Sequence, residues 1–309
     1  MIKDIKDLEG LEIFLGYKCS VKCVFCYQKD LRFKYNKNLS KKEVIKLLEK
    51  GFNDGKKFVI FSGGEPTLDD NLGYYIDYSK KLGFEHIRVH SNGYGFKNLE
   101  YLKEMHSKGM TGVTISIHGY EEVYDKISQV KGSFDGIKNA LRNFEILKKI
   151  DNNFIFDTNT VVSKDNYRDI PRLVKFLCNF SVTRGQIVLA YSLDMFSKDE
   201  KLSIIPEYKD IIDSLKKSLK IAYLFNKKFV LENIPFCVID KEYWSQILKN
   251  IKINKDSITI HEGNLGNTNL TWMMTSNKCK KCSMNNLCRG LPKDYYEIYG
   301  DNCINPIYD

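Results

Sequence analysis

The sequence predicts an α/β protein whose parallel sheet is covered by helices and curls into an open, partial barrel. The first observation is that apolar, β-branched runs alternate with helical patterns over about the first 190 residues, as is typical of parallel sheets. The second is that polar or glycine-containing turns follow several of these runs, at Gly63–Pro66, Ser91–Gly93 and His118–Gly119. Because barrels of this kind carry their active sites at the carboxyl ends of the strands, these turns mark the expected site.

Each predicted element has a local signal. Strands are indicated by β-branched and aromatic content, and helices by apolar residues at three- and four-residue spacing. Ser40 and Glu43 form a capping box at the start of one helix, and Ser133 is expected to cap another. The predicted strands are 11–16, 58–62, 86–93, 111–117, 154–162, 186–190 and 229–233. The predicted helices are 40–51, one ending at 82, one ending near 108, one beginning at 133, 171–180 and 207–225.

The strand at 111–117 shows which side of the sheet faces the lumen, the space inside the barrel. Val113, Ile115 and Ile117 share one face of this strand, and they suit packing against the outer helices. The other face carries Thr114, Ser116 and His118. A polar inner face predicts a bound polar ligand. We interpret His118 as a histidine that supports the site rather than contacting the ligand.

Composition narrows the class of protein. The 309 residues suffice for one large and one small domain. There is no apolar run of about 18 residues and no signal peptide at the N-terminus, which predicts a cytoplasmic protein without a membrane segment. In that compartment nine cysteines indicate metal binding rather than disulfides.

The formal net charge of +9 comes mainly from lysines spread along the chain. This distribution indicates a generally basic, solvated surface rather than a nucleic-acid groove. No nucleic-acid partner is therefore expected, although a basic face would attract acidic electron carriers.

Three cysteines, Cys19, Cys23 and Cys26, follow the first predicted strand at C-x3-C-x2-C spacing. Thiolates are soft ligands that suit zinc or iron–sulfur clusters. A closed zinc site calls for four protein ligands and a cubane cluster for a ligand on each of its four irons, yet this loop offers three cysteines and no fourth lies nearby. The loop therefore indicates a cluster with one iron open to a small molecule, with zinc as the alternative.

The motif Gly63-Gly64-Glu65-Pro66 follows the strand at 58–62. Together with the cysteine loop, in which Phe25 precedes the third cysteine, it resembles the radical S-adenosylmethionine (SAM) superfamily. The resemblance implies a partial (β/α)6 TIM-like barrel and a [4Fe–4S] cluster whose open iron chelates SAM. It also implies that the two glycines bring backbone close to SAM and that Glu65 holds its ammonium group. Further SAM-binding residues implied in this way are Pro66, Ser91 and Asn92 after the strands, with Ser116 and Asn159 for the ribose and carboxylate.

A second cysteine group, Cys279, Cys282 and Cys288, has C-x2-C-x5-C spacing. It resembles the C-terminal twitch or SPASM extension of radical SAM enzymes, although Pro292 stands where a full SPASM domain has a cysteine. The resemblance implies one auxiliary [4Fe–4S] cluster, with Cys237 as fourth ligand and Cys303 as its competitor. Structural zinc is the alternative.

Two domains are predicted, a radical SAM barrel at 1–225 and a small iron–sulfur, twitch-type domain at 226–309. Cys178 lies on the apolar side of a predicted helix and is expected to be an inert core thiol. The chain would thus carry two [4Fe–4S] clusters, one of which binds SAM.

The implied activity is reductive SAM cleavage to a 5′-deoxyadenosyl radical that abstracts hydrogen from a substrate. The runs 115–119, 124–127 and 132–134 look closest to the branch of molybdenum-cofactor and peptide-maturing enzymes. A peptide side chain is the leading substrate class. A small molecule or cofactor precursor is the alternative, although an arginine cluster for a triphosphate is lacking. A non-catalytic metal scaffold is a third possibility, which the SAM motif disfavours.

Partners follow from the same hypothesis. Only ten residues precede the first predicted strand, so a separate leader-recognition protein is expected to help deliver a peptide. Tyr295, Tyr296 and Tyr299 offer an aromatic platform for it, or simply pack the small domain. A flavodoxin or ferredoxin is the expected electron donor.

Overall fold

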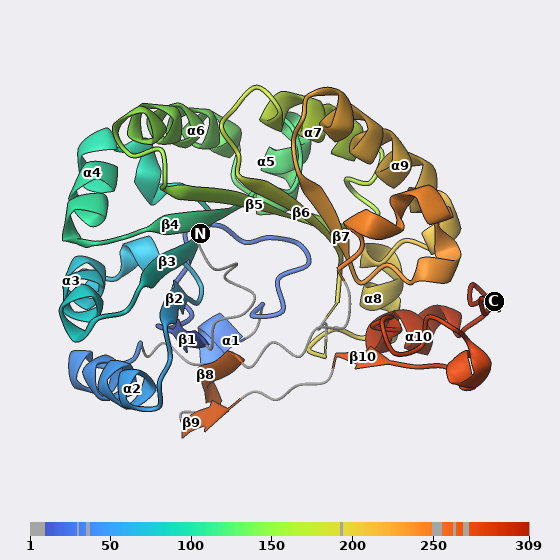
Figure 1. Ribbon diagram of the computed structural model, residues 1–309, viewed down its shortest axis with the longest axis horizontal. Coiled ribbons are helices and arrows are strands. Elements are labelled where there is room, and N and C mark those ends of the chain that lie inside the picture. Colours follow the sequence, from blue (N-terminus) through green and yellow to red (C-terminus); the bar gives the residue numbers. More distant parts are fainter. Residues whose placement is uncertain are drawn as a thin grey trace.

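The computed structural model describes residues 10–29, 31–34, 38–191, 194–248, 255–261, 264–267 and 272–308. Its centre is one curved sheet in the order β7-β6-β5-β4-β3-β2-β1-β8-β9, in which β1 to β7 are parallel. The seven parallel strands are β1 (Gly10–Phe14), β2 (Phe58–Ser62), β3 (His86–Ser91), β4 (Gly112–Ser116), β5 (Ile155–Val162), β6 (Arg184–Leu189) and β7 (Phe229–Glu232). Figure 1 shows helices on the outer side of this curved wall. The predicted partial barrel is confirmed, and the strand predicted at 229–233 joins its sheet as β7.

The helices alternate with the strands along the chain. They are α1 (Leu31–Lys34), α2 (Lys41–Asn53), α3 (Leu72–Leu82), α4 (Leu99–Lys108), α5 (Glu122–Ser128), α6 (Ser133–Ile150), α7 (Ile170–Leu177), α8 (Lys198–Ile204) and α9 (Tyr208–Leu224). The capping box at Ser40 and Glu43 forms as predicted. The predicted cap at Ser133 is wrong, because Ser133 is the first helical residue and its hydroxyl donates to Asp125.

The core lies between the sheet and the outer helices. Val113, Ile115 and Ile117 are fully buried there, as the alternation along β4 predicts. From α6, the residues Ile137, Leu141, Phe144 and Leu147 face them from the helix side. Burying each such side chain stabilises the fold by about 1.5–3 kcal/mol. Cys178 is also buried in this core, in keeping with an inert thiol.

The chain that follows β7 bonds to both edges of the seven-strand sheet. On one edge, Ile247 forms a parallel bridge with Leu231, and the Leu248 amide donates to the Leu231 carbonyl over 2.8 Å. On the other edge, β8 (Lys255–His261) pairs in parallel with β1, and β9 (Asn264–Asn267) pairs with β8. The boundary predicted after residue 225 therefore falls inside this sheet, because β7 and β8 come from beyond it.

The C-terminal region packs against α8 and the start of α9. It contains β10 (Met273–Met274), β11 (Leu291–Pro292) and α10 (Lys293–Tyr299). Tyr295 is buried with its ring 4.4 Å from that of Tyr208, and the Tyr299 hydroxyl donates to the Ile205 carbonyl. Two of the three tyrosines considered as a peptide platform thus pack this region, and Tyr296 is 40% exposed.

A buried ion pair joins the same two parts. Lys201 of α8 lies 2.9 Å from an Asp294 carboxylate oxygen and 2.6 Å from one of Glu297, both on α10. Burial by itself lowers the pKa of Lys201, but hydrogen bonds to Glu297 and Asp294 outweigh it and raise the pKa. The lysine therefore stays charged and holds α10 to α8.

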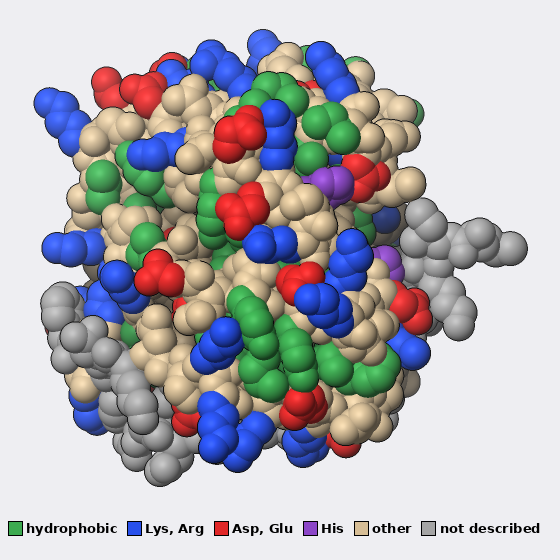
Figure 2. Space-filling view, turned by 90° about the vertical axis from the view of Figure 1, so that its left-hand side faces the viewer, with side chains coloured by type: hydrophobic (Ala, Val, Ile, Leu, Met, Phe, Trp, Pro, Cys, Tyr) green, Lys and Arg blue, Asp and Glu red, His purple; other side chains and the backbone are tan. Residues whose placement is uncertain are grey.

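Two features of the described residues bear on what the surface contacts: the character of the helices and the distribution of charged side chains. Within the described residues, no helix combines the length and apolar character that a bilayer crossing needs. On the face shown in Figure 2, lysines and arginines are interspersed with acidic side chains. This mixing suits the solvated surface expected from the sequence.

We predict that Lys201→Ala destabilises the protein by about 3–5 kcal/mol, because it removes the cation beside the buried Asp294 carboxylate. Lys126→Ala is the matched control, since Lys126 forms an exposed pair with Asp165 and exposed pairs contribute little. Denaturant unfolding monitored by fluorescence measures both. Equal destabilisation of the two variants would contradict the role given to Lys201.

Candidate active site

The cysteine loop follows β1 at the carboxyl edge of the sheet. Cys19, Cys23 and Cys26 are free and half-buried. Burial raises the pKa of Cys23 to about 12, with further contributions from the neighbouring Cys26 and Cys19 thiols. The fold thus brings the three thiols together. Loading them with metal must offset this burial, because only thiolates act as ligands.

The loop is fixed by backbone hydrogen bonds to the end of α5. The amides of Lys22 and Val24 donate to the carbonyls of Ser128 and Ile127 over 2.9 and 3.0 Å. The loop that carries the three thiols is thereby tied to one helix terminus. The loop's position therefore depends on how that terminus is held.

Asp125 holds the end of α5. Its carboxylate accepts hydrogen bonds from the Gly132 amide (2.5 Å), the Ser133 hydroxyl (2.9 Å) and the Phe134 amide (2.9 Å). These contacts close the turn between α5 and α6. They also give a physical reason for the sequence runs 124–127 and 132–134, because these residues hold the helix end to which the cysteine loop is bonded.

The glycine pair packs against the chain that enters the loop. The Gly64 amide donates to the Gly16 carbonyl over 2.7 Å, and the Glu65 amide to the Lys18 carbonyl over 2.8 Å. A Cβ added at Gly64 would lie 2.3 Å from the Lys18 oxygen, and one at Gly63 would lie 2.7 Å from the Gly16 oxygen. Glycine is therefore required here by contact within the protein itself, whereas the sequence suggested approach to a ligand.

Glu65 is buried and links β2 to β3. Its Oε1 accepts from the Thr67 amide and hydroxyl and from the Ser91 hydroxyl, and its Oε2 accepts from the Asn92 amide over 2.7 Å. Burial raises the pKa of Glu65, and these hydrogen bonds oppose the rise. Because a carboxylate oxygen has about two acceptor sites, Oε2 retains capacity for one ammonium donor.

Asn92 joins the end of β3 to the cysteine loop. Its Nδ2 donates to the Ser20 hydroxyl over 2.9 Å and lies 3.7 Å from the Cys19 sulfur. Its Oδ1 accepts from the Tyr94 amide. Pro66 is buried as the first residue of a short 3-10 turn. Ser91, Asn92 and Pro66 thus lie around Glu65, beside the cysteine loop.

Ser116 and Asn159 are neighbours in register on β4 and β5. The Oδ1 atom of Asn159 is buried and has no hydrogen-bond partner among the described groups. A buried amide oxygen without a partner is costly, and a hydroxyl or amine of a ligand would satisfy it. This orphaned oxygen fits the expected place of SAM.

Phe25 and His118 pack edge to face, with ring centroids 4.9 Å apart. The His118 Nδ1 accepts from the Val161 amide, and its carbonyl accepts from Asn166. Burial lowers the pKa of His118 to about 3, so the imidazole is neutral. Its contacts match the supporting role predicted for it.

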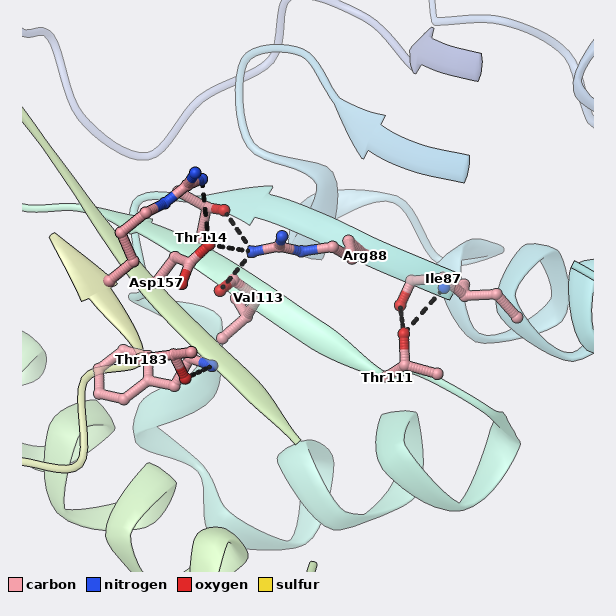
Figure 3. Close-up of polar contacts among 9 residues, drawn as sticks. Ile87, Arg88, Thr111, Val113, Thr114, Asp157 and Thr183 are labelled. Carbon is pink, nitrogen blue, oxygen red and sulfur yellow. Dashed lines mark hydrogen bonds and ion pairs between the residues drawn. The ribbon is translucent and has the colours of Figure 1, made fainter. Parts of the chain in front are cut away.

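A buried ion-pair network fills the lumen toward the amino ends of the strands. Arg88 of β3 lies 2.8 Å from Asp157 Oδ2 on β5 and donates to the Thr114 hydroxyl of β4 (Figure 3). Arg184 of β6 lies 3.4 Å from the same carboxylate oxygen. The sequence analysis missed this network. The inward and outward alternation used for β4 also applies to β3 and β5, and it places Arg88 and Asp157 at inward positions. Applying it to those strands would have revealed the ion pair.

A second network lies farther along the lumen. Glu232, the last residue of β7, accepts hydrogen bonds from Gln186 of β6 and from Arg289. Burial and the Glu232 carboxylate raise the pKa of Tyr191, while Arg289 lowers it, so Tyr191 lies within electrostatic reach of this pair. None of these four residues was singled out from the sequence as a lumen residue.

The second cysteine group surrounds a small cavity. Cys237, Cys279, Cys282 and Cys288 all line it. The amides of Ile307 and Gly290 donate to the sulfurs of Cys282 and Cys288 over 3.4 Å, a type of contact that tunes iron–sulfur ligands. The competing residue Cys303 is not among the lining residues and bonds instead with the Tyr295 hydroxyl.

Neither cysteine group is arranged to bind one single metal ion. Among the described side chains, no three His, Cys, Asp or Glu residues are placed to share a single metal ion. A cluster of four irons has a different requirement, because each iron takes its own thiolate. The first group fits a cluster with one open iron, and the second fits four ligands around a cavity.

Comparison with known proteins gives three findings. A family model, that of the radical SAM superfamily, matches residues 13–177. A probable GTP 3′,8-cyclase of Saccharolobus islandicus is 26% identical over 251 residues, which are 78% of this chain and 77% of that protein.

Two solved structures share the fold. SuiB of Streptococcus suis bound to S-adenosylmethionine has a TM-score of 0.64 at 14% identity, covering 93% of this chain and 73% of that one. The enzyme anSMEcpe with bound AdoMet and a peptide has a TM-score of 0.58 at 17% identity, covering 72% of this chain and 62% of that one.

We predict that Gly64→Ala displaces the cysteine loop, because its Cβ collides with backbone rather than with a flexible side chain. The expected cost is about 1–3 kcal/mol, together with loss of iron from the reconstituted protein. Iron analysis and thermal unfolding measure the two effects.

Gly55→Ala is the control for this prediction. Gly55 has a φ of +81° with nothing near its would-be Cβ, so alanine strains the backbone there without a collision. A Gly64→Ala protein with normal iron content would contradict the packing role assigned to Gly64.

Proposed function

The chain belongs to the radical SAM superfamily, and from that premise we propose that it removes hydrogen from a polar small molecule held in the barrel. In this family a [4Fe–4S] cluster and SAM together supply the one-electron cleavage of the sulfonium and a 5′-deoxyadenosyl radical that abstracts hydrogen. The protein's part is to bind, orient and exclude water.

Named residues support each part of this proposal. Cys19, Cys23 and Cys26 would hold the cluster. Oε2 of Glu65 would accept from the SAM ammonium group, and Ser116 and Asn159 would bind its ribose and carboxylate. The observation that carries the assignment is the unpartnered Asn159 oxygen, on a strand end that faces the same site as the three thiols.

Two observations support a small molecule over a peptide. The relatives matched over most of their length are named for a reaction of GTP, a small molecule. In addition, β8 pairs along one edge of the seven-strand sheet, and residues 247–248 bond to the other edge at Leu231, which leaves less free edge for an added peptide strand. The peptide substrate favoured by the sequence becomes the second candidate.

The second candidate has its own support. The fold likeness to anSMEcpe with a bound peptide shows that a related barrel accommodates one. Under this candidate a separate leader-recognition protein would deliver the peptide. Co-expression with short peptides encoded beside the gene, followed by mass spectrometry, separates the candidates: a mass change in a peptide supports this one, and turnover of a free metabolite supports the first.

We further propose one auxiliary [4Fe–4S] cluster in a twitch-type region, ligated by Cys237, Cys279, Cys282 and Cys288. Their common cavity and the amide–sulfur contacts support it. A flavodoxin or ferredoxin would supply electrons, as acidic carriers suit a protein of net charge +9.

Replacing Cys19, Cys23 and Cys26 together with alanine is expected to abolish 5′-deoxyadenosine formation under dithionite, because no site for the SAM-binding cluster remains. Chromatographic assay of the nucleoside measures this. Cys178→Ala, which alters a buried core thiol, is the control and should retain formation. Persistent SAM cleavage by the triple variant would refute the assignment.

Anaerobically reconstituted protein is expected to carry about eight irons, and the triple variant about four. Cys237→Ala should lose the auxiliary cluster because Cys237 lines the cavity, whereas Cys303→Ala should keep it. Iron and zinc analysis with electron paramagnetic resonance distinguishes these outcomes. The reverse behaviour of the two variants would move the fourth ligand, and zinc without iron in the triple variant would rule out the cluster.

A further inference from the structure

We infer that the substrate carries no phosphate chain, and that Glu232 is the residue that makes the lumen reject one. This inference rests on the proposed function, since it concerns the substrate of the same barrel. It separates this chain from relatives named for a reaction of GTP.

The chain has seven arginines, and all of them lie among the described residues, so the partners of each can be examined. Two of them, Arg88 and Arg184, reach the lumen but share the Asp157 carboxylate. A third, Arg289, is bonded to Glu232. Each of these three guanidinium groups therefore has a carboxylate neighbour, and the carboxylate that two of them share lies toward the amino ends of the strands, away from the expected SAM site.

The remaining four arginines come from helices and loops rather than from the strands of the lumen wall. Arg32 donates to the Val21 carbonyl and Arg172 pairs with Glu121 on the surface. Arg142 donates to Asn139 on the exposed side of α6, and Arg168 lies over the ring of Tyr167. The seven parallel strands contain no lysine. Tight binding of a phosphate chain relies on guanidinium, ammonium or convergent amide donors, and the seven strands of the lumen wall offer no such cation without a carboxylate neighbour.

Glu232 is placed to oppose a phosphate chain directly. Its side chain is 13% exposed and that of Arg289 is 31% exposed. Gln186 stands beside Asn159 in register, so the Gln186–Glu232–Arg289 network adjoins the expected SAM site. A phosphate that approached Arg289 would also approach the Glu232 carboxylate in a poorly solvated space, where like charges repel strongly.

The same groups suit a different ligand. Gln186 presents an amide, and Tyr191 presents a hydroxyl that burial keeps protonated. Glu232 and Arg289 together form a pair without net charge. Such a set matches amide, hydroxyl, or paired ammonium and carboxylate groups on an uncharged or zwitterionic substrate. The substrate class is thus a polar molecule without net negative charge.

The test uses anaerobically reconstituted protein with SAM bound, and equilibrium dialysis with GTP and with inorganic triphosphate. Wild-type protein is expected to show no saturable retention of either probe up to millimolar concentration. Glu232→Gln keeps the size of the side chain but releases Arg289 from its carboxylate. We expect this variant to bind triphosphate about tenfold or more tightly than wild type, and the added change Arg289→Gln to cancel the gain.

Glu121→Gln is the matched control, because it frees Arg172 on the outer surface and should not create lumen binding. Glu232→Ala provides a second route to the same release should Glu232→Gln fail to fold, and SAM retention reports that each variant is intact. Saturable GTP binding by wild type that Arg289→Gln abolishes would overturn the inference. Folded Glu232 variants with no gain would also overturn it. Neither result touches the proposed SAM cleavage, which 5′-deoxyadenosine formation tests separately.

Discussion

The site depends on one buried carboxylate and the glycine beside it. Glu65 ties the end of β2 to the end of β3 through Ser91 and Asn92, while Gly64 lets the same turn press against the backbone that leads into the cysteine loop. Asn92 then reaches the loop itself at Ser20. Three strand ends and the metal-binding loop are thus positioned by one cluster of contacts around a charge that burial would otherwise disfavour.

Much of this arrangement was within reach of the sequence, and the exceptions have physical causes. The alternation along 111–118 gave the inner and outer faces because the side-chain period of a strand is two. The cysteine and glycine motifs gave the site because their spacing is local. The sequence predicts Ser133 as a helix cap, yet the Asp125 carboxylate accepts from the amides of this turn. Sequence spacing alone does not choose between the Ser133 hydroxyl and the Asp125 carboxylate as the acceptor.

Long-range pairing lay beyond such reasoning. The Arg88–Asp157 pair joins residues 69 positions apart, and β8 has no periodic signal that assigns it to the edge of β1. The predicted boundary after residue 225 followed the end of a helix, while the sheet continues through β7. Composition and motif reveal which residues do chemistry, but partners across a lumen depend on how strands from distant segments align.

The position of β8 has a consequence for how the chain folds. As β1 leaves the ribosome it can pair with β2, but its other neighbour begins at residue 255. That edge of β1 therefore stays unpaired until most of the chain has been made, and an unpaired strand edge is prone to join other chains. Contacts this distant in sequence also slow folding. The barrel wall is therefore expected to be completed late, and truncations that remove β8 to leave that edge of β1 exposed.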